Sequence, residues 1–424
     1  MGLYLSRHPR GRAAALPTID LALLALRVPV AFSGAMYAPA YGAWIEAFGA
    51  GGVHGVAALW TLAMPALWIA LGVPLFQRME EELGVVRMLG VGCALVFLSG
   101  AVGFLSEDVG MLLLSRSIVG IGAAALLVST TTILAKRHVG SARKLWLSRQ
   151  AGGMTFAGMI GVVLVGALTQ QDWRLSLLLP AVALPAYGLA LWLSLRAATL
   201  WRPRYFVEAE HLSLGAPPLL VVPLVNAPYS RAATETRTPW RLIAFGATGG
   251  ALLMLYFAAV QLLCTHVALE FELDALELSG LLACLMGGAG LSRWQASRLP
   301  RAFGHPRSLA IGFLLAALGL ATASRSATPW LMTAPLFLAG VGFGAIRPVL
   351  GWWMSRVTEE PRRARSLARV SAAYYVGISL SPLFVLFVQD WRRLWWGLAA
   401  VLLVWAVVAF VLSFRAGWSE ADTL

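Results

Sequence analysis

Long apolar stretches recur along this chain, and each is closed by a short polar segment. A helix needs about 20 apolar residues to cross the roughly 30 Å hydrocarbon layer of a bilayer. Lipid offers no hydrogen-bond partner to an open backbone, so such spans are expected to be helices. The pattern predicts about twelve spanning helices, near residues 20–43, 55–76, 86–106, 110–134, 147–169, 174–196, 241–265, 276–297, 308–325, 330–354, 367–388 and 392–414.

One polar interruption, residues 197–240, is much longer than the others. Its short apolar piece, residues 219–225, is bounded by prolines and is too short to cross a bilayer, so we expect it to lie on the membrane surface or against the helices. The chain is therefore expected to form an N-terminal six-helix bundle over residues 1–196, a cytoplasmic linker over 197–240 and a C-terminal six-helix bundle over 241–424.

The two halves share a sequence repeat at a separation of about 220 residues. The matches, in chain order, are the loop 77–87 with 297–307 (Gly84 with Gly304 and Arg87 with Arg307), the element Gly120-Ile-Gly122 with Gly340-Val-Gly342, Arg149 with Arg369, and Gln-Asp-Trp-Arg at 171–174 with the same letters at 389–392. Four matches in one order indicate duplicated halves. Parallel repeats around a site near the bilayer midplane are a transporter architecture.

Composition supports a membrane protein. Hydrophobic residues make up 59% of the 424 residues and charged residues only 12%, whereas about a quarter of an ordinary soluble domain is charged. The net charge of +13 could suggest a nucleic-acid partner, but the arginines lie in short clusters between apolar runs, which is typical of cytoplasmic flanks of membrane helices. We therefore expect contact with the lipid bilayer and none with nucleic acid.

The distribution of basic residues predicts the orientation. If the N-terminus is inside, most of the 33 Lys and Arg residues face the cytoplasm. The basic residues on the outer side are then Arg174, Arg325, Arg392 and Arg393. Cytoplasmic loops carry an excess of Lys and Arg, so we expect a multi-pass protein of the cell (inner) membrane with both termini in the cytoplasm.

Cofactor chemistry has little support in the sequence. Cys93, Cys264 and Cys284 lie inside or at the end of apolar runs and lack the spacing of metal ligands. A phosphate-binding G-x-x-x-x-G-K-S/T loop is also missing. We expect no cofactor and no metal, with energy supplied by an ion gradient or by the solute itself.

The loop after the second predicted span carries a recognisable motif. Gln77 stands first, Glu81 supplies an acid, Glu82 follows it, and Gly84 and Arg87 complete the pattern. This resembles the G-x-x-x-D-R-x-G-R-R motif of the major facilitator superfamily, with the first glycine and the arginine replaced. In that family the acid makes a charge contact that latches the two halves on the inner side.

The fourth predicted span contains Arg116, Gly120 and Gly122, which resembles the R-x-x-x-G-x-G element of the same family. The resemblance implies the family fold, two six-helix bundles related by a pseudo-twofold repeat, and a conformational or proton-coupling role for the arginine. The expected gating and coupling residues are Asp20, Glu81, Gly84, Arg87, Arg116, Gly120 and Gly122. Asp20 is included as an acid at the inner end of the first span.

The fifth predicted span is rich in glycine, with Gly153, Gly158, Gly161 and Gly166. This resembles the glycine-rich motif of antiporters in the family, although the Gly-Pro pair of that motif is absent. Export and uptake therefore both remain open at this point.

Three arginines, Arg27, Arg116 and Arg347, fall within predicted spans, whereas every Asp and Glu falls in a loop or at a helix end. A charge in hydrocarbon costs at least about 2.5–3.5 kcal/mol on insertion scales. The alternatives are snorkelling of Arg27 and Arg347 to the headgroups and structural pairing of Arg116. Guanidinium groups bind carboxylate or phosphate with two hydrogen bonds, so a cavity with arginines and no buried acid favours an anionic substrate.

Tyrosine and amide side chains on the helices that line the cavity in the family would complete such a site, although each could equally be a packing residue. The expected substrate-binding residues are Arg27, Tyr37, Tyr41, Arg116, Gln150, Tyr256, Gln261, Arg347 and Tyr374, with Tyr375 beside the last.

Together these features favour a secondary active transporter that exports a small organic metabolite or drug-like compound, with an anion such as a carboxylate siderophore as a candidate, coupled to a proton gradient. The expected partners are this small-molecule substrate and a proton or other coupling ion, and the protein is expected to be a monomer. An uptake permease for an organic anion is the alternative. A non-transporting membrane sensor and a membrane-embedded enzyme are more distant ones. An enzyme is not expected, because the only local acid cluster, Glu80–Glu82, fits the latch motif better.

Overall fold

The computed structural model describes residues 28–31, 33–49, 52–137, 140–182, 185, 188, 240–295, 299–357, 360–386 and 390–414. Within these ranges every regular element is a helix. Nine helical segments are long and apolar enough to cross a membrane: His54–Glu80, Val85–Phe104, Val109–Leu134, Arg149–Thr169, Ile243–Glu270, Ala275–Gln295, His305–Ala323, Pro329–Gly351 and Trp391–Leu412. A shorter apolar segment, Val370–Leu386, adds to them. Part of the predicted first span, most of the sixth and nearly all of the 197–240 linker lie outside the described residues, so a total of twelve spans stays a prediction.

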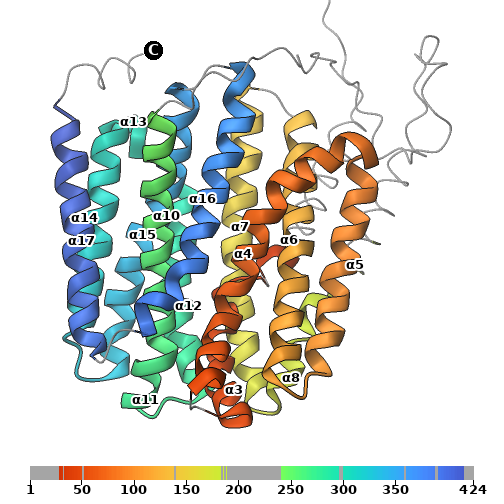
Figure 1. The fold of residues 1–424 in the computed structure, drawn as a ribbon. Helices are drawn as coiled ribbons and strands as arrows, with labels where there is room; N and C mark the ends of the chain where they lie inside the picture. Colours follow the sequence, from red (N-terminus) through yellow and green to blue (C-terminus); the bar gives the residue numbers. More distant parts are fainter. Residues whose placement is uncertain are drawn as a thin grey trace, which may run out of the picture.

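The long helices form two groups that lie side by side in Figure 1. The first contains α4 (Gly52–Leu83), α5 (Val85–Phe104), α6 (Val109–Arg137) and α7 (Gly140–Thr169). The second contains α10 (Trp240–Leu262), α12 (Ala275–Gln295), α14 (His305–Ala323), α15 (Pro329–Val357), α16 (Glu360–Leu386) and α17 (Trp391–Leu412). In the first group α6 packs on α4 and α5; in the second α15 packs on α12 and α14. The groups meet where α7 packs on α12 and α4 packs on α16.

Helix α17 shows why these segments suit lipid. Its inner face buries Trp395 and Leu402 completely, and it packs on α14. Its opposite face leaves Val404 and Val407 more than half exposed. A helix that is apolar all round and still exposed on one side is stable only in an apolar solvent. The fold class predicted from the sequence, an all-helical membrane protein, is confirmed.

The first predicted span is not the single continuous helix expected over 20–43. Over the described residues it consists of α2 (Val28–Ala31), a 3₁₀ helix η1 (Ala35–Ala40) and α3 (Tyr41–Phe48). Gly34 leaves the helical region with φ −103° and ψ −155°, and Pro39 lies inside η1. Proline donates no backbone hydrogen bond and its ring obstructs the preceding turn. Tyr37 and Tyr41 therefore do not continue one straight helical stripe.

The sequence repeat has a counterpart in backbone geometry. Gly84 and Gly304 have φ values of 77° and 75°, and each immediately precedes the next helix of its half. Such positive φ values favour glycine, which lacks a Cβ. Asp172 and Asp390 likewise cap the helices that follow them, each accepting a backbone hydrogen bond at 2.9 Å from the arginine two residues later.

The paired glycines of α6 and α15 contact corresponding helices of the two halves. A Cβ on Gly120 would lie 2.6 Å from the carbonyl oxygen of Pro65 in α4. A Cβ on Gly340 would lie 2.0 Å from that of Leu285 in α12. Close backbone approach through small residues is typical of membrane helices. Since α12 occupies in the second half the place of α4 in the first, the structure carries the duplicated architecture.

Candidate functional site

Glycines line the contact between the two groups of helices. A Cβ on Gly166 of α7 would lie 2.6 Å from the carbonyl oxygen of Ala275 in α12. A Cβ on Gly287 of α12 would lie 3.2 Å from the sulfur of Met159 in α7. We call this α7–α12 contact the seam. The glycine-rich pattern of the fifth predicted span therefore serves, in part, to bring the two halves together.

The seam is also bridged at the end of α7 that leads into α8 (Trp173–Ser176). There Gln170 Nε2 donates a hydrogen bond of 3.1 Å to Asp274 Oδ2 of the second half. Near the same end α3 contacts the π-helical turn η4 (Leu263–Val267). The two halves are thus in contact at this end of the molecule.

Arg116 and Tyr37 come together inside the first half. Arg116, in α6, is 1% exposed, and its Cζ lies 4.2 Å from the centre of the Tyr37 ring in η1. Arg116 Nε donates to the Thr61 carbonyl oxygen of α4 at 3.4 Å, and Tyr37 Oη donates to the Ser176 carbonyl oxygen of α8 at the same distance. A guanidinium over an aromatic face is stabilised by the ring quadrupole. This pair joins η1, α4, α6 and α8.

Two glutamines predicted to bind substrate are buried and have unsatisfied side-chain atoms among the described residues. Gln150 in α7 is 1% exposed and Gln261 in α10 is 0% exposed. The side-chain nitrogen of each, and the side-chain oxygen of Gln261, have no hydrogen-bond partner in the described part of the chain. Buried polar atoms are normally satisfied by protein or water, so these amides are suited to meet a solute or water. Tyr41 is half-buried at the start of α3.

A third predicted group gathers in the second half. Arg347 of α15 has its Cζ 5.5 Å from the ring of Tyr374 and 6.0 Å from that of Tyr375, both on α16. Gly249 makes room for Tyr374, because a Cβ there would lie 1.8 Å from the ring. The ring of Tyr256 in α10 packs edge-on against the ring of Phe343 in α15, with 5.2 Å between the ring centres. The structure thus brings Arg347 and Tyr374 together as the site hypothesis requires.

One arginine of this region was missed. Arg293, near the end of the eighth predicted span, is not among the predicted site residues, but in α12 its Nη1 donates to Thr155 Oγ1 of α7 across the seam at 2.5 Å. A sequence feature could have found it: Arg293 follows Met286 and Gly290 at steps of four and three, on the helix face that meets α7.

The structure describes only some of the remaining residues predicted to act in gating or binding. Asp20, Arg27 and the side chain of Glu81 lie outside the described residues. The neighbouring Glu80 accepts a hydrogen bond of 2.8 Å from Thr132 Oγ1 of α6, within the first half. Arg87 is exposed at the start of α5.

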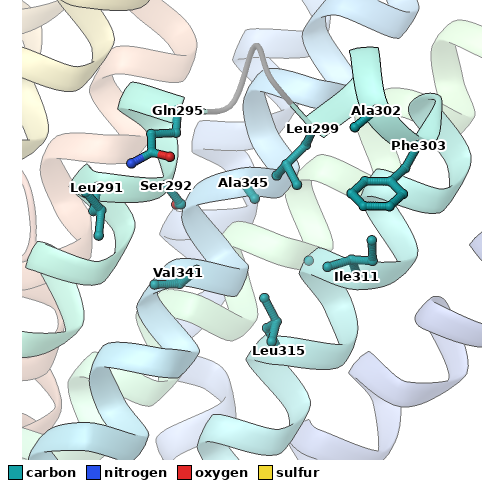
Figure 2. Close-up of a pocket in the computed structure, with 11 residues that line it drawn as sticks. Leu291, Ser292, Gln295, Leu299, Ala302, Phe303, Ile311, Leu315, Val341 and Ala345 are labelled. Atoms are coloured by element: carbon teal, nitrogen blue, oxygen red, sulfur yellow. The ribbon is translucent and has the colours of Figure 1, made fainter.

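An apolar pocket of about 340 Å³ lies within the second half, among α12, α13 (Leu299–Phe303), α14 and α15 (Figure 2). Ser292 and Gln295 are its polar lining residues, and apolar side chains such as Leu299, Phe303 and Ile311 make up most of the rest. None of the predicted substrate-binding residues lines it. It does not suit an anionic solute.

Comparison with known proteins agrees with this architecture. The family model described as Major Facilitator Superfamily matches residues 23–303 and 248–420. A crystal structure of the peptide transporter POT in complex with alafosfalin is similar, with a TM-score of 0.68 and 15% identity, over 97% of this chain and 96% of that one. The xylose transporter XylE from E. coli in its inward open conformation is similar with a TM-score of 0.70 and 14% identity, over 93% of this chain and 95% of that one. No curated protein sequence matches this chain.

The family match covers nearly all of the sequence, and the helical repeat, the apolar surface and the close glycine contacts are those of a multi-pass membrane protein. The chain belongs to the Major Facilitator Superfamily and is a membrane transporter, not an enzyme.

Proposed function

We propose that this transporter is secondary active and exports a small organic anion from the cytoplasm in exchange for protons. The observation that carries the proposal is the group around Arg347: a guanidinium faces two tyrosine rings, and no ion pair joins it to an acid of the described chain. A cation without a fixed counter-charge attracts anions and repels cations.

The proposed arrangement has bundles over residues 1–196 and 241–424, joined by a cytoplasmic linker over 197–240. The excess of basic residues on the linker side supports cytoplasmic termini in the inner membrane. The end where Gln170 meets Asp274 is then the outer end, and its closed contact supports an inward-facing state. The similarity to a transporter solved inward open supports this assignment.

Export is supported by the glycine-rich helix α7. Its likeness to the antiporter motif and its position on the seam suit a helix that moves against its partner during alternating access. The neighbouring folds belong to transporters of a peptide and a sugar, which supports a small polar solute.

The test uses purified protein in lipid vesicles with an imposed pH gradient. Radiolabelled citrate serves as the anionic probe, xylose as the neutral one and tetraphenylphosphonium as the cationic one. We expect citrate flux that is saturable, depends on the gradient and runs opposite to the protons. Arg347→Gln should reduce it by about tenfold or more, since a hydrogen bond to a charged group contributes about 1.5–3 kcal/mol.

Arg325→Gln is the matched control. Arg325 is exposed beyond the end of α14 and stacks on Trp396 of α17, so it belongs to neither helix of the seam. Flux of the cation at the rate of citrate, or flux that ignores Arg347, contradicts the anion proposal. Flux in the same direction as the protons contradicts export by exchange and favours the uptake permease.

A further inference from the structure

Arg293 is a half-buried cation on the seam, and among the described residues its one hydrogen-bond partner is Thr155. Its Nη1 donates to Thr155 of α7, while its Nε atom is buried and has no partner among the residues described. Buried guanidinium groups are usually paired with carboxylates or phosphates. Part of the hydrogen-bonding capacity of Arg293 is therefore unused.

Arg293 and Arg347 belong to one cluster. Helix α12 approaches α15 so closely that a Cβ on Gly344 would lie 2.2 Å from the Oγ atom of Ser292. Arg293 is the next residue after Ser292, and Arg347 is one turn after Gly344. The charge of Arg293 interacts electrostatically with Arg347, Tyr256 and Tyr375, and Tyr256 packs on Phe343, the residue before Gly344.

The described chain supplies no acid to this cluster. The described ion pairs lie elsewhere: Arg392 at the start of α17 pairs with Glu270, and Arg393 pairs with Asp390 within the first turn of α17. Two like charges in a poorly solvated site repel each other and destabilise the protein unless an anion is present. A bound ligand with two negative charges would therefore neutralise the two arginines.

We propose that Arg293 and Arg347 together form a binding site for an anion with two or more negative charges, either two carboxylates or a phosphate, with tyrosine hydroxyl groups as further donors. This inference rests on the proposed function and specifies the substrate class of the same transporter. Each planar guanidinium can donate two parallel hydrogen bonds to one carboxylate or to two oxygens of a phosphate. A monoanion can satisfy only one of them.

The position of Arg293 also links binding to the seam. Its bond to Thr155 crosses from the second half to the first, so a ligand that draws the guanidinium toward Arg347 competes with a contact between the halves. Differential contacts of this kind are what a ligand needs in order to shift a conformational equilibrium.

The test measures equilibrium binding to purified protein in detergent, without any gradient. The probes are radiolabelled citrate, succinate and inorganic phosphate, with acetate as the monoanion. We expect at least one of the three multivalent anions to bind at least about tenfold more tightly than acetate. Arg293→Gln and Arg347→Gln should each weaken this binding by about tenfold to a hundredfold.

Arg293→Lys keeps the charge without the planar fork and should weaken binding to a smaller extent. It also decides the question if the glutamine variant does not fold. Thr155→Val removes the partner of Arg293 and should leave the binding at least as tight, whereas Arg325→Gln should leave it unchanged. A preference for citrate and succinate over phosphate assigns the carboxylate chemistry, and the reverse assigns phosphate.

Three results would overturn the site: affinity for acetate equal to that for the multivalent anions, no binding of any of the four probes, or multivalent binding that survives substitution of both arginines. Because no gradient is present, a failure of export or of proton coupling in vesicles does not alter this result. Conversely, if the protein moves anions in vesicles but both arginine variants bind them as tightly as the parent protein, anion transport is supported and this site is rejected.

Discussion

A single methyl group at Gly166 should shift the balance between the two conformations of this transporter. In Gly166→Ala the new Cβ would lie 2.6 Å from the Ala275 carbonyl oxygen and 2.7 Å from the Cβ of Ser279. Both atoms belong to the other half, so the conflict exists only while this end of the seam is closed. Overpacking of a tight contact costs about 1–3 kcal/mol, which corresponds to a change of about 5–150-fold in the conformational equilibrium.

Gly153→Ala on the same helix is the matched control. A Cβ on Gly153 meets nothing within 4 Å. Alanine stabilises a helix by about 1 kcal/mol relative to glycine at either position, and this contribution cancels in the comparison. The two variants therefore differ in the contact across the seam alone.

The assay is a distance measurement by electron paramagnetic resonance between spin labels at Gln171 and Leu276, which are both exposed near the two sides of the contact. Gly166→Ala should populate a longer distance that Gly153→Ala and the parent protein show weakly. Identical distance distributions for the two variants would refute the argument that this contact controls the state.

Three further changes probe the fold and its contacts. Gly84→Ala should lower stability by about 1 kcal/mol or more, because φ is 77° there although the space around it is open; thermal unfolding in detergent checks this, and an unchanged midpoint contradicts it. Gly249→Ala should displace the ring of Tyr374, lower the unfolding temperature and impair anion binding. The double variant with Tyr374→Ala should recover the unfolding temperature, and a double variant that does not recover it rejects the steric cause. Glu270→Gln should change stability by less than about 1 kcal/mol, because its 2.7 Å ion pair with Arg392 is about 40% exposed on both sides; a larger fall in the unfolding temperature shows a greater role.

The sequence predicts best those features that depend only on a segment's own residues and its immediate surroundings. Apolar length alone located the nine candidate spans found among the described residues, because lipid imposes one rule on every segment. The paired glycines were informative for a similar reason: a positive φ or a backbone contact admits little else than glycine, so the letter records the geometry.

Prediction was weaker where geometry depends on distant segments. Arg293 looked like an ordinary basic residue at a span end, and its burial follows from the packing of α7, which belongs to the other half. The prediction of a continuous first helix is wrong for a different reason. Hydrophobic length predicts one helix there, whereas Gly34 and Pro39 interrupt the helix.

The structure places two of the three predicted arginines, and the anion-binding role of these residues stays a prediction. Arg347 does lie with tyrosines, and Arg116 does meet Tyr37, but the latter pair is enclosed within one half and holds four elements together. No property of the sequence distinguishes an arginine that braces a bundle from one that faces a solute, because both are single cations in apolar helices.

The π-helical turn Leu263–Val267 has a consequence for how this fold can change over evolution. A π turn holds an extra residue, so everything after it is rotated by about 100° compared with an uninterrupted α-helix. Glu270, which lies after the turn, accepts hydrogen bonds from Trp391 and Arg392 at the start of α17. Loss of one codon within the turn would restore the ordinary helical phase and point Glu270 elsewhere, so the contact of Glu270 with the start of α17 depends on the number of residues in the turn as much as on their identity.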